Sequence, residues 1–264
     1  MSSSTCANCA CPLTGAYCAQ CGQAASAAHP PTIGHLAHEL GHELLHVDGA
    51  IWRTVTALYL RPGELTREYW AGRRVGWIGP FRVFLIAAAA LLVFVPGIGP
   101  MNFQTLVQRK AECGFDVSIG AAVERQNGRP GMTPVSDREA DAYRAELRRG
   151  YSSIRYLAVP IFAAGTWLLY LRRQSFYASH VVLALHFYSF WYTVSVGTSL
   201  LPYRLGALLG VGLSAVYLFL ALRRLFSESA IRTLAKSTAL FAFMTAIEGA
   251  LAFTSALWVT RNWA

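Results

Sequence analysis

Four cysteines near the start of the chain have the spacing of a metal site. Cys6 and Cys9 form one C-x2-C pair, and Cys18 and Cys21 form a second pair after eight intervening residues. Two such pairs supply four thiolates for tetrahedral zinc, and bound zinc contributes the folding free energy that so short a segment lacks. We therefore predict a structural zinc ribbon over residues 1–24, with zinc as the expected cofactor.

Two other interpretations of these cysteines remain open, a pair of disulfides or a redox-active C-x2-C. Disulfides need an oxidising compartment. The first residues, MSSSTCANC, lack the basic and then apolar pattern of a signal peptide, so we expect this end of the chain in the cytosol. Cys11 lies between the pairs and could compete as a ligand, whereas Cys113 is isolated.

A second pattern with metal chemistry, HELGH, occupies residues 38–42. It matches H-E-x-x-H, in which two histidines one helical turn apart hold zinc and the glutamate acts as general base. Five of the seven histidines lie within residues 29–46, so the match arises easily by chance, and it precedes the first apolar run. A zinc metalloprotease at His38, Glu39 and His42 is the least favoured function, with His38 and His42 as a candidate second metal site.

The composition places these sites on a membrane protein. The 264 residues are 54% hydrophobic and 14% charged, against about 25% charged in a soluble domain. Long charge-free runs cause the deficit, which excludes a disordered chain and an ordinary soluble enzyme. The net charge of +9 comes from arginines beside apolar runs, where they contact lipid headgroups. Membrane lipid is therefore an expected partner, and nucleic acid is not.

The apolar runs predict an all-α integral membrane helical bundle of about five transmembrane helices. About 19 residues at 1.5 Å each cover the bilayer core. Gly206, Gly210 and Ser214 are spaced four apart, which favours close packing of that helix on another. The bundle is expected over residues 81–264, with spans at about 81–98, 153–171, 177–201, 205–222 and 237–260 and an extracytoplasmic loop at 99–152.

Arginines indicate the orientation of these spans. They are frequent before the first span and in two of the later connections, and such segments belong on the cytoplasmic side. We expect a multi-pass protein of the bacterial inner membrane, with a cytoplasmic N-terminus and an extracytoplasmic C-terminus. The residues concerned are Arg67, Arg73, Arg74, Arg172, Arg173, Arg223, Arg224, Arg232 and Lys236.

Residues 25–80 link the ribbon to the first span. Apolar side chains three or four residues apart from Ile33 to Leu58 predict a long amphipathic juxtamembrane helix, which ends at the Pro-Gly pair 62–63. Such a helix lies in the membrane interface or packs on another helix. The stretch 61–80 is rich in arginine, tryptophan and tyrosine, a composition typical of the headgroup level.

Several short motifs together resemble the bacterial membrane family catalogued as domain of unknown function 3667. The resemblance extends from Cys6 to about Arg232 and implies a multi-pass membrane protein with a zinc ribbon and no established activity. The motifs are C-G-Q at 21–23, Asp48 and Thr54 in the following helix, R-P-G at 61–63, E-Y-x-x-G-x-R at 68–74, Pro80, and HVVLALHFYSF at 180–190.

Two ionisable residues, His186 and Glu248, lie near the middle of the third and fifth spans. Such groups are costly in lipid, so we expect them either to pair and fix the helix packing or to relay a proton. The expected function is a non-enzymatic scaffold, recruiting or sensing protein whose ribbon binds a protein partner. The alternative is a small permease that uses His186 and Glu248. We assign no catalytic residue.

Overall fold

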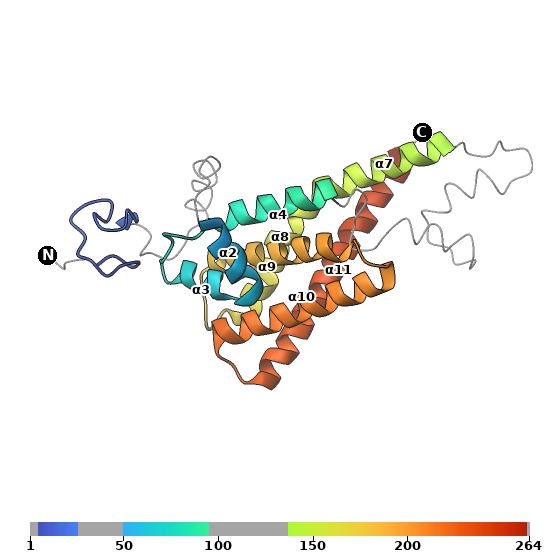
Figure 1. The fold of residues 1–264 in the computed structure, drawn as a ribbon. Coiled ribbons are helices and arrows are strands. Elements are labelled where there is room, and N and C mark those ends of the chain that lie inside the picture. The colour runs from blue at the N-terminus through green and yellow to red at the C-terminus, as the bar shows by residue number, and fades with distance from the viewer. Residues whose placement is uncertain (1–4, 26–49, 95–136, 263–264) are drawn as a thin grey trace, which may run out of the picture. The chain divides into compact units, whose positions relative to one another are not determined.

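The computed structural model describes residues 5–25, 50–94 and 137–262, and its ribbon is drawn in Figure 1. Within these ranges the elements are helices, together with two isolated β-bridges in the cysteine-bearing segment. The predicted all-α class is confirmed for this part of the chain. The chain divides into two compact units, residues 1–95 with 159–241 and residues 96–158 with 242–264, and each is described by itself.

Four helical stretches are long and apolar enough to cross a membrane, which indicates a membrane protein. They correspond to the second to fifth predicted spans. A shorter apolar helix, α4 (Pro80–Phe94), corresponds to the first, whose predicted end lies outside the described residues. The number of spans and their orientation stay predictions. The four stretches are Ala145–Tyr170, Tyr177–Thr198, Arg204–Phe226 and Ala230–Val259.

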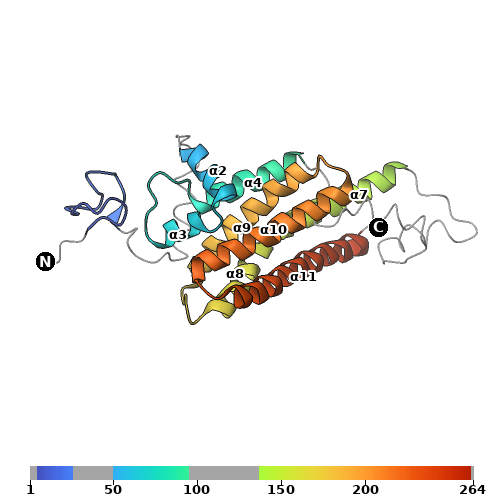
Figure 2. The same ribbon diagram turned by 60° about the horizontal axis from the view of Figure 1, so that its bottom comes forward.

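The centre of the first unit is α9 (Tyr177–Thr198), which is buried on all sides over most of its length. This explains its sequence, because a helix surrounded by other helices needs no polar face. It packs against α4 and α10 (Tyr203–Phe226), which lie alongside it in Figure 2, and against the short helices α2 (Ala50–Leu60) and α3 (Glu64–Trp70).

Aromatic side chains form much of the contact between these helices. The ring of Phe190 in α9 stacks on Tyr217 in α10, with centroids 4.0 Å apart. Phe84 of α4 contacts Tyr192 at 5.7 Å, and Tyr59 of α2 contacts Phe190 at 5.6 Å. Rings at such separations contribute dispersion and quadrupole energy beyond the area they bury. They fix the helices that carry the juxtamembrane motifs against α9.

The small residues of α10 allow it to approach α9 closely, as predicted. A Cβ added to Gly206 would overlap the backbone carbonyl of Thr198, and one added to Gly210 would lie 3.3 Å from the Thr198 hydroxyl. Ser214 continues this face and is fully buried. Small side chains at four-residue spacing therefore bring the two backbones together.

The amphipathic juxtamembrane helix falls only partly within the described residues, as α2. Its buried face consists of Thr54, Ala57 and Leu58, while Trp52 on the other side is 79% exposed. Leu58 belongs to the predicted apolar stripe, but Val55 of that stripe is exposed. The helix therefore presents apolar surface on both sides, which suits an element in contact with lipid as well as protein.

The Ala145–Tyr170 stretch combines three elements, α7 (Asp137–Ile154), η3 (Arg155–Leu157) and α8 (Ala158–Tyr170). Pro160 has no backbone N–H and cannot donate to the carbonyl four residues earlier, so the α-helical pattern is interrupted just before it.

In the second unit, α7 packs against the end of α11 (Ala230–Asn262). Leu147 contacts Ala256 and Val259 there. Gly150 leaves room for the hydroxyl of Ser255, which would lie 2.8 Å from an added Cβ.

Candidate metal centre and juxtamembrane segment

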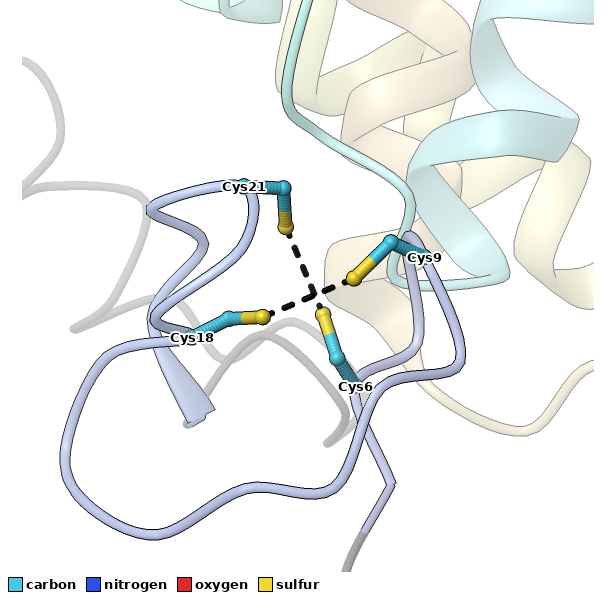
Figure 3. A group of neighbouring side chains, drawn as sticks. All are labelled: Cys6, Cys9, Cys18 and Cys21. Atoms are coloured by element: carbon cyan, nitrogen blue, oxygen red, sulfur yellow. Dashed lines mark hydrogen bonds between the residues drawn. The ribbon is translucent and has the colours of Figure 1, made fainter.

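The four predicted cysteine ligands converge on one point, as Figure 3 shows. Their sulfur atoms all lie within 4.8 Å of one another, with 3.6 Å between Cys6 and Cys21 and 3.5 Å between Cys9 and Cys18. Tetrahedral zinc with bonds of about 2.3 Å holds its sulfurs roughly 3.8 Å apart. These four thiols could therefore hold a metal ion, and their separation is too large for disulfides.

Each cysteine pair is held by the same two backbone hydrogen bonds. In the first pair the Cys6 N–H donates to the Cys11 carbonyl at 2.8 Å, and the Ala10 N–H donates to the Cys6 carbonyl at 2.9 Å. The two bonds recur twelve residues later, both at 2.8 Å, from Cys18 to Gln23 and from Gly22 to Cys18. We call residues 5–25, with these two matching halves, the ribbon.

The repeat assigns an equivalent to each residue of the ribbon. Ala10 and Gly22 are equivalent and both have positive φ, 62° and 74°, a conformation that costs Ala more than Gly. Cys11 is equivalent to Gln23 and is not among the four converging thiols.

Backbone amides also prepare the first cysteine of each pair for a metal. Hydrogen bonds from the N–H groups of Cys21 and Gln20 lower the pKa of the Cys18 thiol to about 7. The N–H groups of Cys9 and Asn8 do the same for Cys6, whose pKa is also lowered. The thiolate is the form that binds metal, so the amides favour it at the first cysteine of each pair, whereas the pKa of the neighbouring Cys9 thiol is raised.

The side chain of Gln23 joins the ribbon to the loop that follows α3. Its Nε2 donates to the Gly72 carbonyl at 2.7 Å, and its Oε1 accepts from the Arg74 N–H at 3.0 Å. The Gln23 residue is only 4% exposed, and Gly72 has a φ of 74° that a side chain would disfavour. One amide group thus satisfies two backbone groups of residues 71–79, which we call the juxtamembrane segment.

The E-Y-x-x-G-x-R motif stabilises the same segment from α3. The guanidinium of Arg73 donates twice to the carboxylate of Glu68, at 2.5 and 2.8 Å. These hydrogen bonds hold the pKa of Glu68 below its usual range. The guanidinium of Arg74 lies over the Tyr69 ring, 4.3 Å from its centre.

The R-P-G motif and Thr54 fix both ends of this region. Gly63 has a φ of 79°, and a Cβ there would lie 3.0 Å from the backbone of Ala221 in α10. The buried hydroxyl of Thr54 accepts a hydrogen bond from the Ile78 N–H at 3.0 Å. The glycine therefore allows α3 to begin against α10, and the threonine holds the juxtamembrane segment against α2.

His186 contacts α3 in the middle of α9. Its Nδ1 lies 2.9 Å from the Thr66 hydroxyl, and it lines a cavity of about 30 Å³. That volume suffices for about one water molecule. The other residues around the cavity are Leu65, Tyr69, Arg73, Arg74, Trp77, Ile78 and Gly79.

Glu248 belongs to the second unit, where it accepts a hydrogen bond from the Tyr151 hydroxyl. Glu248 is 1% exposed, and the similarly buried Arg155 lies with its guanidinium 5.8 Å from the centre of the Tyr151 ring. Neither Tyr151 nor the neighbouring Arg155 was predicted to lie in this cluster, although Arg155 is conspicuous as a charge in an apolar run. His186 and Glu248 lie in different units, so their predicted pairing stays a prediction.

Other sequence features lie outside the described residues. They are the HELGH motif with His38 and His42, the isolated Cys113, Asp48, and residues 99–136 of the predicted extracytoplasmic loop. Metal binding at the HELGH motif therefore stays a prediction.

The motif residues just described lie mostly in a segment that matches a known family. Residues 48–92 match the family described as protein of unknown function, DUF3667. We call this matching segment the DUF3667 domain. It comprises α2, α3, the juxtamembrane segment and most of α4, so the resemblance drawn from the motifs is confirmed there. Within the DUF3667 domain, Thr54, Gly63 and Gly72 each have a defined structural role. Neither the curated proteins nor the solved structures contain a match to the chain.

Proposed function

We propose that this protein is a non-enzymatic scaffold or sensing protein of the bacterial inner membrane, with a structural zinc ribbon that recruits a protein partner. The observation that supports this most is the convergence of four thiols in a ribbon that Gln23 attaches to the DUF3667 domain. Zinc bound there would supply folding free energy and leave no open coordination position for catalysis.

Zinc fits this donor set better than other common metals. A closed set of four thiolates at tetrahedral separations is typical of zinc or iron–sulfur sites, and excludes calcium and magnesium. Thiolates persist in a reducing compartment, which favours a cytoplasmic ribbon and, with five spans, an extracytoplasmic C-terminus. Tyr17 of the ribbon is 69% exposed, and exposed aromatic side chains are common in protein-binding surfaces.

Metal analysis of the purified full chain tests the zinc site. We expect about one zinc per chain, lost in Cys18→Ser and kept in Cys11→Ser, the matched control from the equivalent half of the ribbon. If Cys18→Ser kept the full zinc content, the metal would have to bind elsewhere, with His38 and His42 as the first candidates. That result would overturn this proposal.

Recruitment is tested by pull-down in mild detergent with the intact chain and with the double variant Cys6→Ser/Cys9→Ser. We expect a protein partner that binds the intact chain and not the variant. Equal capture by both would show that the ribbon does not mediate the interaction.

The buried groups of the second unit favour a second candidate, a small permease or proton path that uses Glu248, with His186 as its predicted partner. Glu248 and Arg155 both lie in stretches long enough to span a membrane, and ionisable residues there often serve transport. Reconstituted vesicles with a trapped pH indicator test it. Proton flux that Glu248→Gln abolishes would support transport, and absence of flux in the wild type would exclude the proton path.

A further inference from the structure

We propose that metal occupancy of the ribbon controls the juxtamembrane segment through Gln23, and thereby controls the cavity beside His186. This inference rests on the proposed zinc site and adds a regulatory role to it. The metal-loaded ribbon holds residues 71–79 in place, and the metal-free ribbon releases them.

The position of Gln23 depends on the metal. The Gln23 carbonyl accepts the Cys18 N–H at 2.8 Å, so its backbone is part of the second cysteine pair. The ribbon is about twenty residues long, with two isolated β-bridges and few buried side chains. So small a segment does not fold on apolar burial alone, and metal binding supplies its folding free energy.

The backbone position of residues 71–79 depends in turn on Gln23. The segment is not helical, and Gly72 and Gly76 both have positive φ, 74° and 86°. The N–H groups of residues 71–73 still bond to carbonyls of α3, but the Gly72 carbonyl and the Arg74 N–H point to the ribbon instead. The Gln23 amide supplies one donor and one acceptor to Gly72 and Arg74, and without it both groups must find water or another partner.

The same segment forms part of the wall of the cavity. Gln23 bonds to the backbone of Arg74, and Arg73 is its neighbour. Both arginines line the cavity together with Trp77 and His186. Their side chains are held by Glu68 and Tyr69, and the N–H groups of Gly72 and Arg73 bond to α3. Gln23 is the group of the ribbon that holds the Gly72 carbonyl and the Arg74 N–H. Release of this backbone therefore alters the wall of the cavity that His186 lines.

Hydrogen exchange of the full chain in detergent, read by mass spectrometry, tests the proposal. Four samples are compared: zinc-loaded wild type, wild type stripped by a chelator, Gln23→Ala and Gln20→Ala. Gln20 is an exposed glutamine of the same ribbon whose side chain is not used at the metal site; Gln20→Ala keeps the backbone N–H beside Cys18 and serves as the matched control. The peptide that covers residues 68–79 reports on the segment, and peptides from α9 report on the rest of the unit.

We expect chelation and Gln23→Ala each to raise exchange in the 68–79 peptide roughly tenfold, the effect of losing about two hydrogen bonds. Gln20→Ala leaves it unchanged, and Gln23→Ala still binds one zinc. Gln23→Ala also makes the segment insensitive to chelation. The α9 peptides stay protected in all four samples.

Two results overturn the inference. One is a wild-type segment whose exchange does not change when the zinc is removed, and the other is a Gln23→Ala segment that still responds to removal. Chelation of the wild type needs no substitution, so a misfolded variant cannot obscure the answer. Failure of the zinc site itself is seen separately, as absence of zinc in the loaded wild type.

Discussion

The hydroxyl of Thr66 in α3 lies 2.9 Å from Nδ1 of His186, in the middle of the buried helix α9. Four residues later in α3, the Trp70 indole N–H donates to the carbonyl of Ser179, near the start of α9. The two contacts run in opposite chain directions, so α3 lies antiparallel to α9. The buried imidazole of His186 in α9 therefore obtains its hydrogen-bond partner from the short helix α3.

We expect Gly63→Ala to destabilise the protein by about 2–4 kcal/mol. The left-handed backbone costs an alanine about 1–2 kcal/mol, and the added methyl lies 3.0 Å from the Ala221 backbone, which cannot move aside without shifting α10. Thermal unfolding in detergent measures the change. Gly212→Ala is the control, because a Cβ there meets nothing within 4 Å and alanine favours a helix. Equal stability of the two variants would show that α3 and α10 are not in close contact.

The ion pair of Glu68 and Arg73 should make the DUF3667 domain sensitive to acid. Because the folded pKa of Glu68 is lowered, the carboxylate contributes stability above its ordinary pKa and loses it as the pH falls towards the folded value. At pH 7 we expect Glu68→Gln to cost about 1 kcal/mol, since Arg73 is partly exposed to solvent.

Melting temperatures of wild type and Glu68→Gln between pH 3 and pH 8 measure this effect. The difference should narrow as the pH falls below about 4. Glu146→Gln is the control, since Glu146 pairs with Arg149 at 3.5 Å on the surface and such pairs contribute little. A difference that is constant across this pH range would exclude the ion pair as its cause.

Removing the Tyr151 hydroxyl should show whether Tyr151 stabilises the second unit by its hydrogen bond to Glu248 or by packing alone. Tyr151→Phe deprives the buried Glu248 carboxylate of a donor, and we expect a loss of about 1–3 kcal/mol in thermal unfolding. Tyr170→Phe is the matched control. The Tyr170 hydroxyl is buried with no hydrogen-bond partner among the described residues, so its removal should be neutral or slightly stabilising. The prediction is wrong if Tyr151→Phe behaves like Tyr170→Phe.

The orientation of the chain can be measured with reporter fusions. We expect a cytoplasmic signal before Pro80 and after Arg223, and an exported signal between Asp116 and Asp141 and after Trp263. A reporter after Arg173 tests the second span, which has the most flanking arginines. A cytoplasmic signal at the C-terminus would mean that the number of spans is not five.

Local patterns in the sequence were enough to locate the four converging cysteines and the apolar helices, because cysteine spacing and hydropathy are properties of neighbouring residues. The partners of His186 and Glu248 were not predictable in this way. Thr66 lies 120 residues from His186, and Tyr151 lies 97 residues from Glu248. Contacts at such separations depend on which helices pack together, and that leaves no periodic pattern in either segment. Gln23 was noticed as part of a motif, but its attachment to Gly72 was not.

The two matching halves of the ribbon offer two alternative ways of attaching it to the DUF3667 domain. Two halves with the same backbone bonds present nearly the same shape, so shape alone gives the DUF3667 domain little basis for choosing between them. The side chains at the equivalent positions 11 and 23 therefore determine which half attaches. A glutamine amide donates and accepts strongly at once, whereas the thiol of Cys11 does both only weakly. One side chain thus decides which of two similarly bonded halves is attached, and exchanging Cys11 with Gln23 should transfer the attachment to Gly72 and Arg74 from the second half to the first.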